Sequence, residues 1–360
     1  MKNYRYKTAA FFAITLLTIS TTLFAAEVTK EYHKEYTTKP TTTLDINSRY
    51  GNVTIESWDK NQIVIDVKVT VNALNRERAE RDISNIDVFF SENGDLIKAL
   101  TKFDSKYFSK GINIESVTIS VDYNIKMPVN TTLNLENRYG NTFINELSGL
   151  VNISIRYGNL TVGKLMRGNE KSLTTIELGY GNVAINEVGW LVLKTQYAGN
   201  VEIPKCTAAL IENRYSNLNF GEVGSIVGES RYGSMNIDNI RNLDLDNRYT
   251  TVKIGMLTNS LKLDNGYGPV TIDRIPSGFE SIEVETKYTN VNLGIADDAS
   301  YELNGEARYG VIKYDNDKFN LTRRIQENNS LKIVGVMKKE VASKSKVMIE
   351  TVYGSVQLGR

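Results

Sequence analysis

The chain has 360 residues, a formal net charge of +1, 41% hydrophobic residues and one cysteine. This balanced charge gives no overall field that would favour nucleic acid or an anionic membrane as a partner. The single cysteine, Cys206, excludes a disulfide within the chain, so the fold must be held by its core and by backbone pairing.

The first residues, 1–26, have the pattern of a secretory signal peptide. Lys2, Arg5 and Lys7 precede an apolar run that ends in small residues at Ala25 and Ala26. An uncleaved membrane anchor is the alternative, and the threonines and serines within the run disfavour it. We therefore expect an exported protein with no transmembrane span after signal removal.

A polar segment and a β-rich region follow. Residues 27–43 show no hydrophobic period, which predicts a linker or a loosely held lead-in strand. Within 44–130, the segment 62–71 alternates apolar and polar residues like a strand with one buried face, and 75–82 predicts a short helix. Further strands are expected in IDVFF, DLIKAL and SVTISVDYNIKM. We expect this region to contain the first coil of a repeat and to cap it.

The remaining segment, 131–360, repeats a motif centred on a tyrosine, and it ends in a full copy of that motif. The intervals include 17, 18, 21 and 23 residues, and a period near 20 is typical of a solenoid. Tyr50 and Tyr353 begin and end the series. The tyrosines between them are Tyr139, Tyr157, Tyr180, Tyr197, Tyr215, Tyr232, Tyr249, Tyr267, Tyr288 and Tyr309.

Apolar residues stand four and six positions before most of these tyrosines and in many copies three and five after them, which predicts two strands flanking a corner. Glycine follows the tyrosine in eight of the twelve copies, and we expect it to supply either a left-handed backbone or room for a close approach there. The tyrosine shares the parity of the preceding core positions, which favours rings stacked inside the corner over a platform for sugars or bases. Left-handed hexapeptide helices keep coils near 18 residues. We therefore expect an all-β fold, a right-handed parallel β-solenoid with coils of roughly 17–23 residues.

A basic residue precedes most of these tyrosines, and the resulting outward file is a candidate site for a polyanion. Acidic residues stand two positions earlier on the same face, so a self-neutralised, solvated surface is the favoured alternative. Asparagines two positions before the tyrosine, such as Asn213 and Asn247, predict an amide ladder between coils. The candidate binding residues are Arg138, Arg156, Arg214, Arg231, Arg248, Lys287 and Arg308.

Residues for catalysis or metal binding are sparse. The only histidine, His33, precedes the repeat, and Cys206 falls on a core position. Asp297 and Asp298 are the one adjacent acidic pair in a loop, where they favour a turn. Phosphate loops, zinc-ligand spacings and nucleotide fingerprints do not occur. We therefore expect no enzyme, no catalytic residue, no metal and no cofactor.

Two segments, LDINSRYGNVTIESWDKNQIVIDVKVT and VDYNIKMPVNTTLNLENRYGN, resemble the bacterial putative-adhesin family of exported β-strand-repeat proteins, a group largely of unknown function. The GNVTIESWD turn, the strand entry at Tyr123 to Pro128 and the serial YGN coils carry the resemblance, which covers about 40–360. It implies a β-solenoid in the periplasm or on the cell surface of a Gram-negative-type bacterium. It implies no catalytic or binding residues.

These observations predict an exported, non-enzymatic, adhesin-like β-solenoid that binds or scaffolds at the cell envelope. The expected partner is an envelope polymer, a glycan or a protein surface, and not nucleic acid. A β-helix polysaccharide lyase or hydrolase is one alternative, and it should have clustered carboxylates in a groove. A periplasmic structural or envelope-stress factor is the other.

Overall fold

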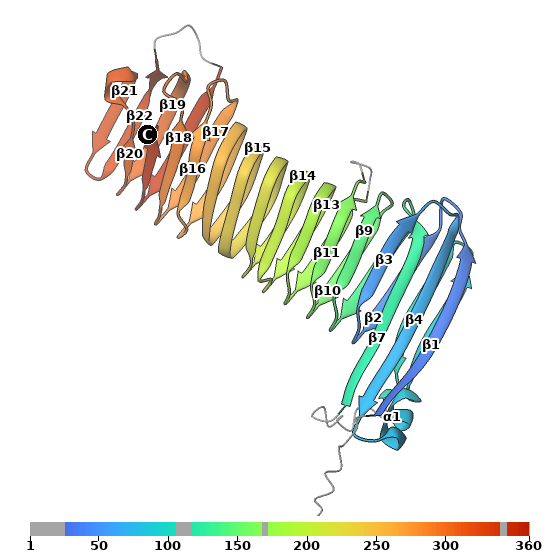
Figure 1. Cartoon of the computed structure of the whole chain (residues 1–360). Coiled ribbons are helices and arrows are strands. Elements are labelled where there is room, and N and C mark those ends of the chain that lie inside the picture. The colour runs from blue at the N-terminus through green and yellow to red at the C-terminus, as the bar shows by residue number, and fades with distance from the viewer. Residues whose placement is uncertain (1–25, 106–116, 168–171, 339–343, 360) are drawn as a thin grey trace, which may run out of the picture.

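The computed structural model describes residues 26–105, 117–167, 172–338 and 344–359, and over these residues the chain is all-β with one α-helix. The predicted all-β class is thereby confirmed. The strands stack along an elongated molecule, with the N-terminal strands at one end and the C-terminal strands at the other (Figure 1). The predicted signal peptide lies outside the described residues except for its last position.

Three long strands form an antiparallel unit at the N-terminal end. β1 (Ala26–Thr37) pairs with β4 (Gln62–Ala73) along its entire length, and β4 pairs with β7 (Val117–Pro128). The lead-in is therefore a strand and not a linker. Val28 and Tyr32 on alternate positions of β1 pack against the core, a period of two that the polar composition obscured.

A second antiparallel pair and a helix complete this end. β5 (Ile86–Asn93) pairs with β6 (Leu96–Phe103). Helix α1 (Arg76–Ile83) is preceded by Asn75, whose side chain accepts a hydrogen bond from the backbone N–H of Arg78 and so caps the helix. The predicted strands and short helix of this region are confirmed.

The segments before the tyrosines form a first ladder of parallel strands. β2 (Thr43–Arg49) pairs with β6 on one side and with β8 (Thr132–Arg138) on the other. In spatial order the ladder then runs through β10 (Val151–Arg156), β12 (Thr174–Gly179) and the later parts of β13 (Val183–Gln196) and β14 (Asn200–Arg214). It continues through the segments of β15 (Asn217–Gly266) that precede Tyr232, Tyr249 and Tyr267, and then through β17 (Ser281–Lys287), β23 (Lys346–Val352) and β19 (Tyr301–Arg308).

The segments after the tyrosines form a second parallel ladder. It starts at β7, which pairs with β3 (Val53–Trp58). It continues through β9 (Thr142–Leu147), β11 (Leu160–Leu165), the earlier parts of β13 and β14, and the segments of β15 that follow Tyr215, Tyr232 and Tyr249. The last members are β16 (Val270–Ile275), β18 (Asn290–Ile295), β24 (Ser355–Leu358) and β20 (Val311–Lys313).

One continuous core joins the two ladders. In the coil around Tyr139, Leu133 and Leu135 before the corner and Ile144 and Leu147 after it are all buried. Equivalent residues repeat in each coil, so the buried faces of both ladders join in a single cluster. Backbone pairing between coils satisfies the polar groups that this arrangement buries.

The C-terminal end is closed by strands out of chain order. β23 and β24, the last strands, lie between the coil of Tyr288 and the coil of Tyr309. Beyond β19, the direction of pairing changes: β22 (Ser330–Met337) is antiparallel to β19, and β21 (Phe319–Glu327) is antiparallel to β22. No helix in the described ranges is long and apolar enough to cross a membrane.

Candidate functional site

The tyrosine of each motif takes the left-handed backbone conformation. All twelve, from Tyr50 to Tyr353, have φ between 51° and 63°. Of the two roles expected for the following glycine, the left-handed backbone was therefore wrong, and the close approach is confirmed. A non-glycine residue in this region costs about 1–2 kcal/mol, so the repeat needs a compensating interaction in every coil.

The glycine after the tyrosine serves a different purpose. A β-carbon built on Gly140 would lie 1.8 Å from the carbonyl oxygen of Gly51, and one on Gly158 would lie 1.9 Å from that of Gly140. All eight such glycines face a backbone oxygen of the adjacent coil within 2.4 Å of the added carbon. Glycine is therefore required because successive coils approach closely.

Stacking of the tyrosine rings supplies the compensation. Neighbouring rings lie 4.7–5.3 Å apart between centroids and are inclined by only 2–14°. Each aromatic pair contributes about 0.5–1.5 kcal/mol beyond its buried area, which is of the order of the backbone cost.

The rings lie on the surface and not inside the corner. From Tyr139 onwards the exposed fraction of these side chains is 44–59%. The prediction of inward rings assumed that side chains alternate between the two faces of the strand up to the tyrosine. The left-handed backbone at the tyrosine breaks this alternation and turns the ring outward. In spatial order from Tyr139 to Tyr353, both faces of each ring are covered by neighbouring rings, and Phe103 contacts Tyr50 edge to face. Tyr309 ends the stack, and among the rings of the described residues only that of Tyr353 contacts it. Within the stack, only ring edges and hydroxyls remain for a ligand. This geometry disfavours a platform on which sugars or bases stack.

A buried amide ladder runs beneath the tyrosines and confirms the prediction made from the asparagines. Asn213 Nδ2 donates to the Ser230 hydroxyl (2.9 Å), and Asn213 Oδ1 accepts from the Thr195 hydroxyl (2.6 Å). Asn247 Nδ2 donates to Asn265 Oδ1 of the next coil (2.7 Å). These side chains join consecutive coils and fix their register.

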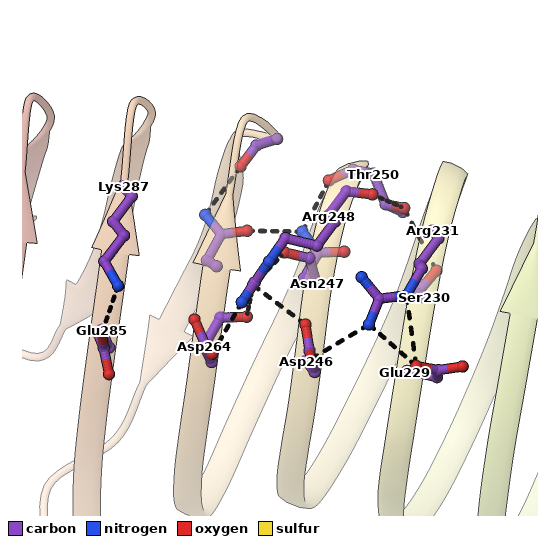
Figure 2. A network of polar contacts seen from close by, with 12 residues as sticks. Glu229, Ser230, Arg231, Asp246, Asn247, Arg248, Thr250, Asp264, Glu285 and Lys287 are labelled. Carbon is purple, nitrogen blue, oxygen red and sulfur yellow. Dashed lines mark hydrogen bonds and ion pairs between the residues drawn. The ribbon is translucent and has the colours of Figure 1, made fainter.

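Ion pairs neutralise most of the outer basic file. The nitrogen–oxygen distances are 2.5–3.6 Å. Arg214, Arg231 and Arg248 each contact acids of two coils, so ion pairs form a continuous zigzag along these coils. Figure 2 shows this zigzag from Glu229 to Asp264. Hydrogen bonds from Arg231 lower the pKa of Glu229 below its ordinary value of 4.5. The pairs are Arg138 with Glu136, Arg214 with Glu212 and Glu229, Arg231 with Glu229 and Asp246, Arg248 with Asp246 and Asp264, Lys287 with Glu285, and Arg308 with Glu306.

Arg156 is the exception among the seven candidate basic residues. No carboxylate within the described residues forms an ion pair with it, because Ser154 occupies the position where other coils carry an acid, and Glu177 of the next coil pairs with Lys194 (3.3 Å). Beside Arg156, Gly179 interrupts the basic file. A β-carbon added to Gly179 would meet nothing closer than 3.9 Å, so this position is open.

A cavity of about 590 Å³ occupies this break, and we call it the Arg156 trough. Strand pairing sets its walls in two rows across four strands. One row is Arg156, Gly179, Gln196 and Arg214, and the other is Ser154, Glu177, Lys194 and Glu212. Tyr157 and Tyr180 line the trough as well, and Ile155 and Leu178 are buried beneath it. The trough brings together three cations and two carboxylates.

The remaining candidates for chemistry lie apart from the trough. Burial raises the pKa of the Cys206 thiol to about 12, so it stays protonated. His33 is exposed on β1 between Asp66 (2.6 Å) and Glu35 (3.1 Å). Asp297 pairs with Lys318, and no three His, Cys, Asp or Glu side chains in the described parts of the chain are grouped so as to hold a metal.

Sequence reasoning missed the trough although a signal for it was present. The segments LGYGN at 178–182 and TQYAGN at 195–200 replace the arginine of the repeat with Gly179 and Gln196 in two consecutive coils. Their adjacency in space follows from the parallel register, Arg156 opposite Gly179 and Gly179 opposite Gln196.

Comparison with solved structures returns proteins described as putative adhesins, the family that the sequence resembles. One from Parabacteroides merdae is 8% identical, with 91% of this chain and 95% of that chain covered and a TM-score of 0.28. A second, from Bacteroides fragilis, is 9% identical, with 91% and 96% covered and a TM-score of 0.27. A putative lipid binding protein from Parabacteroides distasonis is 12% identical, with 91% and 96% covered and a TM-score of 0.27.

No family model matches the chain, and no curated protein matches it. Because TM-scores this low do not establish a shared fold, the proposals below rest on the residues of this chain.

Proposed function

We propose that this protein is an exported, non-enzymatic, adhesin-like β-solenoid that binds or scaffolds at the cell envelope. In this proposal its coils of roughly 17–23 residues wind in a right-handed sense behind an N-terminal cap, and a signal peptide directs the chain to the periplasm or the cell surface. The partner is an envelope polymer, a glycan or a protein surface that contacts the outer face of the coils.

The regular outer surface carries this proposal. Tyrosines stack without interruption from Tyr50 to Tyr309, and the charged rows beside them are paired over most of their length. Stacking and backbone pairing along two ladders make each coil depend on its neighbours, which stiffens an elongated molecule. Such a molecule can hold a binding surface away from the membrane.

The enzymatic alternative requires carboxylates whose pKa values are poised for proton transfer. Hydrogen bonds from Arg231 lower the pKa of Glu229, an acid of the outer face, and so favour its ionised form. This supports a binding surface over a polysaccharide lyase or hydrolase. The periplasmic structural or envelope-stress role differs from the proposal only in where the surface is exposed.

Protease treatment of intact cells tests the proposal. An adhesin-like protein should be cleaved on intact cells, while a periplasmic marker protein in the same sample stays whole until the outer membrane is opened. Complete protection together with the periplasmic marker would contradict direct adhesion and would favour the envelope-stress role.

A further inference from the structure

We propose that the Arg156 trough binds the carboxylate of an acidic saccharide. This inference rests on the binding role proposed above and names the class of its ligand. It assigns the direct contact to one break in the outer face and not to the basic file as a whole.

The charge of the trough points to a carboxylate. A guanidinium presents a planar set of donors that matches a carboxylate in a bidentate geometry. The other six candidate basic residues already have carboxylate partners, whereas Arg156 has none within the described residues. Lys194 and Arg214 add positive charge on the opposite side, so the trough has one more cation than it has anions.

The free space of the trough lies beside this unpaired cation. The basic file is also interrupted at Gly266. There the side chain of Arg248 lies over the glycine and pairs with Asp264, so an added β-carbon would come within 3.1 Å of it. At Gly179 the nearest atom of Arg156 would be 3.9 Å away, and the space stays open. A ligand can therefore occupy the position that a side chain fills elsewhere.

The groups around Arg156 fit a molecule rich in hydroxyls. The Ser154 hydroxyl and the Gln196 amide can donate and accept hydrogen bonds, and Glu177 and Glu212 can accept them from sugar hydroxyls. A peptide carrying acidic side chains would offer few donors to these two carboxylates. The four strands of the trough span roughly 14 Å at the usual strand spacing, which suits a short oligosaccharide.

Isothermal titration calorimetry of the full-length protein with trigalacturonate tests the inference. The same trisaccharide with its carboxylates methyl-esterified removes the charge and keeps the hydroxyls. We expect measurable binding of the acid form and at least about tenfold weaker binding of the ester, because a charge-assisted bidentate contact is lost.

Three variants locate the site. Arg156→Gln should weaken binding of trigalacturonate about tenfold or more. Gly179→Glu should abolish binding, because its carboxylate fills the open position and pairs with Arg156. Arg231→Gln is the matched control: it removes an arginine of the same file that is already engaged with Glu229 and Asp246, and it should leave the affinity unchanged. Circular dichroism checks that each variant is folded.

Several results would overturn the inference. These are failure of the folded wild-type protein to bind trigalacturonate, an equal loss in Arg231→Gln and Arg156→Gln, or equally tight binding of inorganic phosphate or a triglutamate peptide. Each of these outcomes leaves the protease result on intact cells unaffected, so the ligand class and the adhesin-like role are tested separately.

Discussion

Tyr288 stacks on Tyr353 and not on Tyr309, the next motif tyrosine along the chain. The centroids of Tyr288 and Tyr353 lie 5.2 Å apart with the rings inclined by 7°, and Tyr309 covers the other face of Tyr353 at 4.9 Å. The C-terminal coil therefore occupies a place inside the stack, between two coils that precede it in the sequence. Its insertion joins the end of the chain to the ladders.

Removal of residues 344–360 should loosen more than the C-terminus. β17 and β19 both lose their parallel partner β23, and β19 is left with only the β21–β22 hairpin. Hydrogen exchange should become much faster in β17, β19 and β22, because these strands then form an interrupted ladder. Amides of β8 and β10 serve as the internal control and should keep their protection. Unchanged protection in β19 would contradict the inserted position of the last coil.

Replacement of Tyr215 tests the balance between backbone strain and stacking. Tyr215→Gly loses the ring contacts with Tyr197 and Tyr232 but relieves the left-handed backbone, whereas Tyr215→Ala loses the contacts and keeps the strain. Urea unfolding should show the alanine variant to be less stable than the glycine variant by about 1 kcal/mol.

The same series contains its own control. At an ordinary strand position glycine is the less stable of the two, so the reverse order at Tyr215 reports the left-handed backbone. Tyr215→Phe keeps the ring and should have nearly wild-type stability. A glycine variant no more stable than the alanine variant would contradict the account of the corner.

Two glycines near Tyr157 should respond differently to the same change. Gly158→Ala places a β-carbon 1.9 Å from the Gly140 carbonyl oxygen, so the coils must separate, and we expect a loss of several kcal/mol or failure to fold. Gly179→Ala adds the same carbon in open space and should change stability by less than about 1 kcal/mol. Thermal unfolding of both variants measures the difference. Equal melting temperatures would contradict the claim that Gly158 is required by the close approach of adjacent coils.

Asn213→Ala should be costly because it breaks the amide ladder at a buried point. The change removes hydrogen bonds to Thr195, Ser230 and the Ser216 carbonyl. Of these three groups, only Ser230 keeps another side-chain contact within the described residues, to Thr250. We expect a loss of about 2–4 kcal/mol in the free energy of unfolding. Asn292→Ala, the same change at an exposed strand position, should stay within about 0.5 kcal/mol of wild type. Similar losses in both variants would contradict a specific role for the ladder.

The contact between β1 and β4 at His33 should weaken as the pH rises through the raised pKa of this histidine. Hydrogen bonds to Asp66 and then to Glu35 raise the pKa of His33 above its ordinary 6.5. The contribution of protonated His33 is therefore fully present below pH 6.5 and is lost as the pH rises through the raised value. An NMR titration should give a His33 pKa above 6.5 that falls in Asp66→Asn, and amide exchange in β1 should report the weakening. A pKa of 6.5 or below would contradict the contact.

The strands were predictable because a one-sided strand alternates its residues, as 62–71 does in β4. The corner was predictable only in part, because Tyr157 and Gly158 stand side by side in the motif and glycine suits either a left-handed backbone or a close approach. The arrangement of adjacent coils decides between the two: glycine supplies space, and tyrosine takes the strained backbone. The order of the last coils was also hidden, since Tyr309 and Tyr353 carry the same motif and either could follow Tyr288.

The Arg156 trough was predictable from the sequence only in part. Gly179 and Gln196 break the arginine column visibly in the sequence, but a break alone does not distinguish a filled gap from an open one. At Gly266 the side chain of Arg248 fills the gap, and at Gly179 nothing does. The difference depends on which basic residue pairs with the nearby acid: Glu177 pairs with Lys194, and Asp264 pairs with Arg248. Only the three-dimensional arrangement determines these pairs.

Binding without turnover is the central claim, and light scattering during size-exclusion chromatography tests it most directly. Full-length protein is incubated with polygalacturonate and the mixture is separated by size. We predict a complex that elutes ahead of both components and a polymer of unchanged length after prolonged incubation. Protein that elutes alone, or a polymer that becomes shorter with time, would contradict the account.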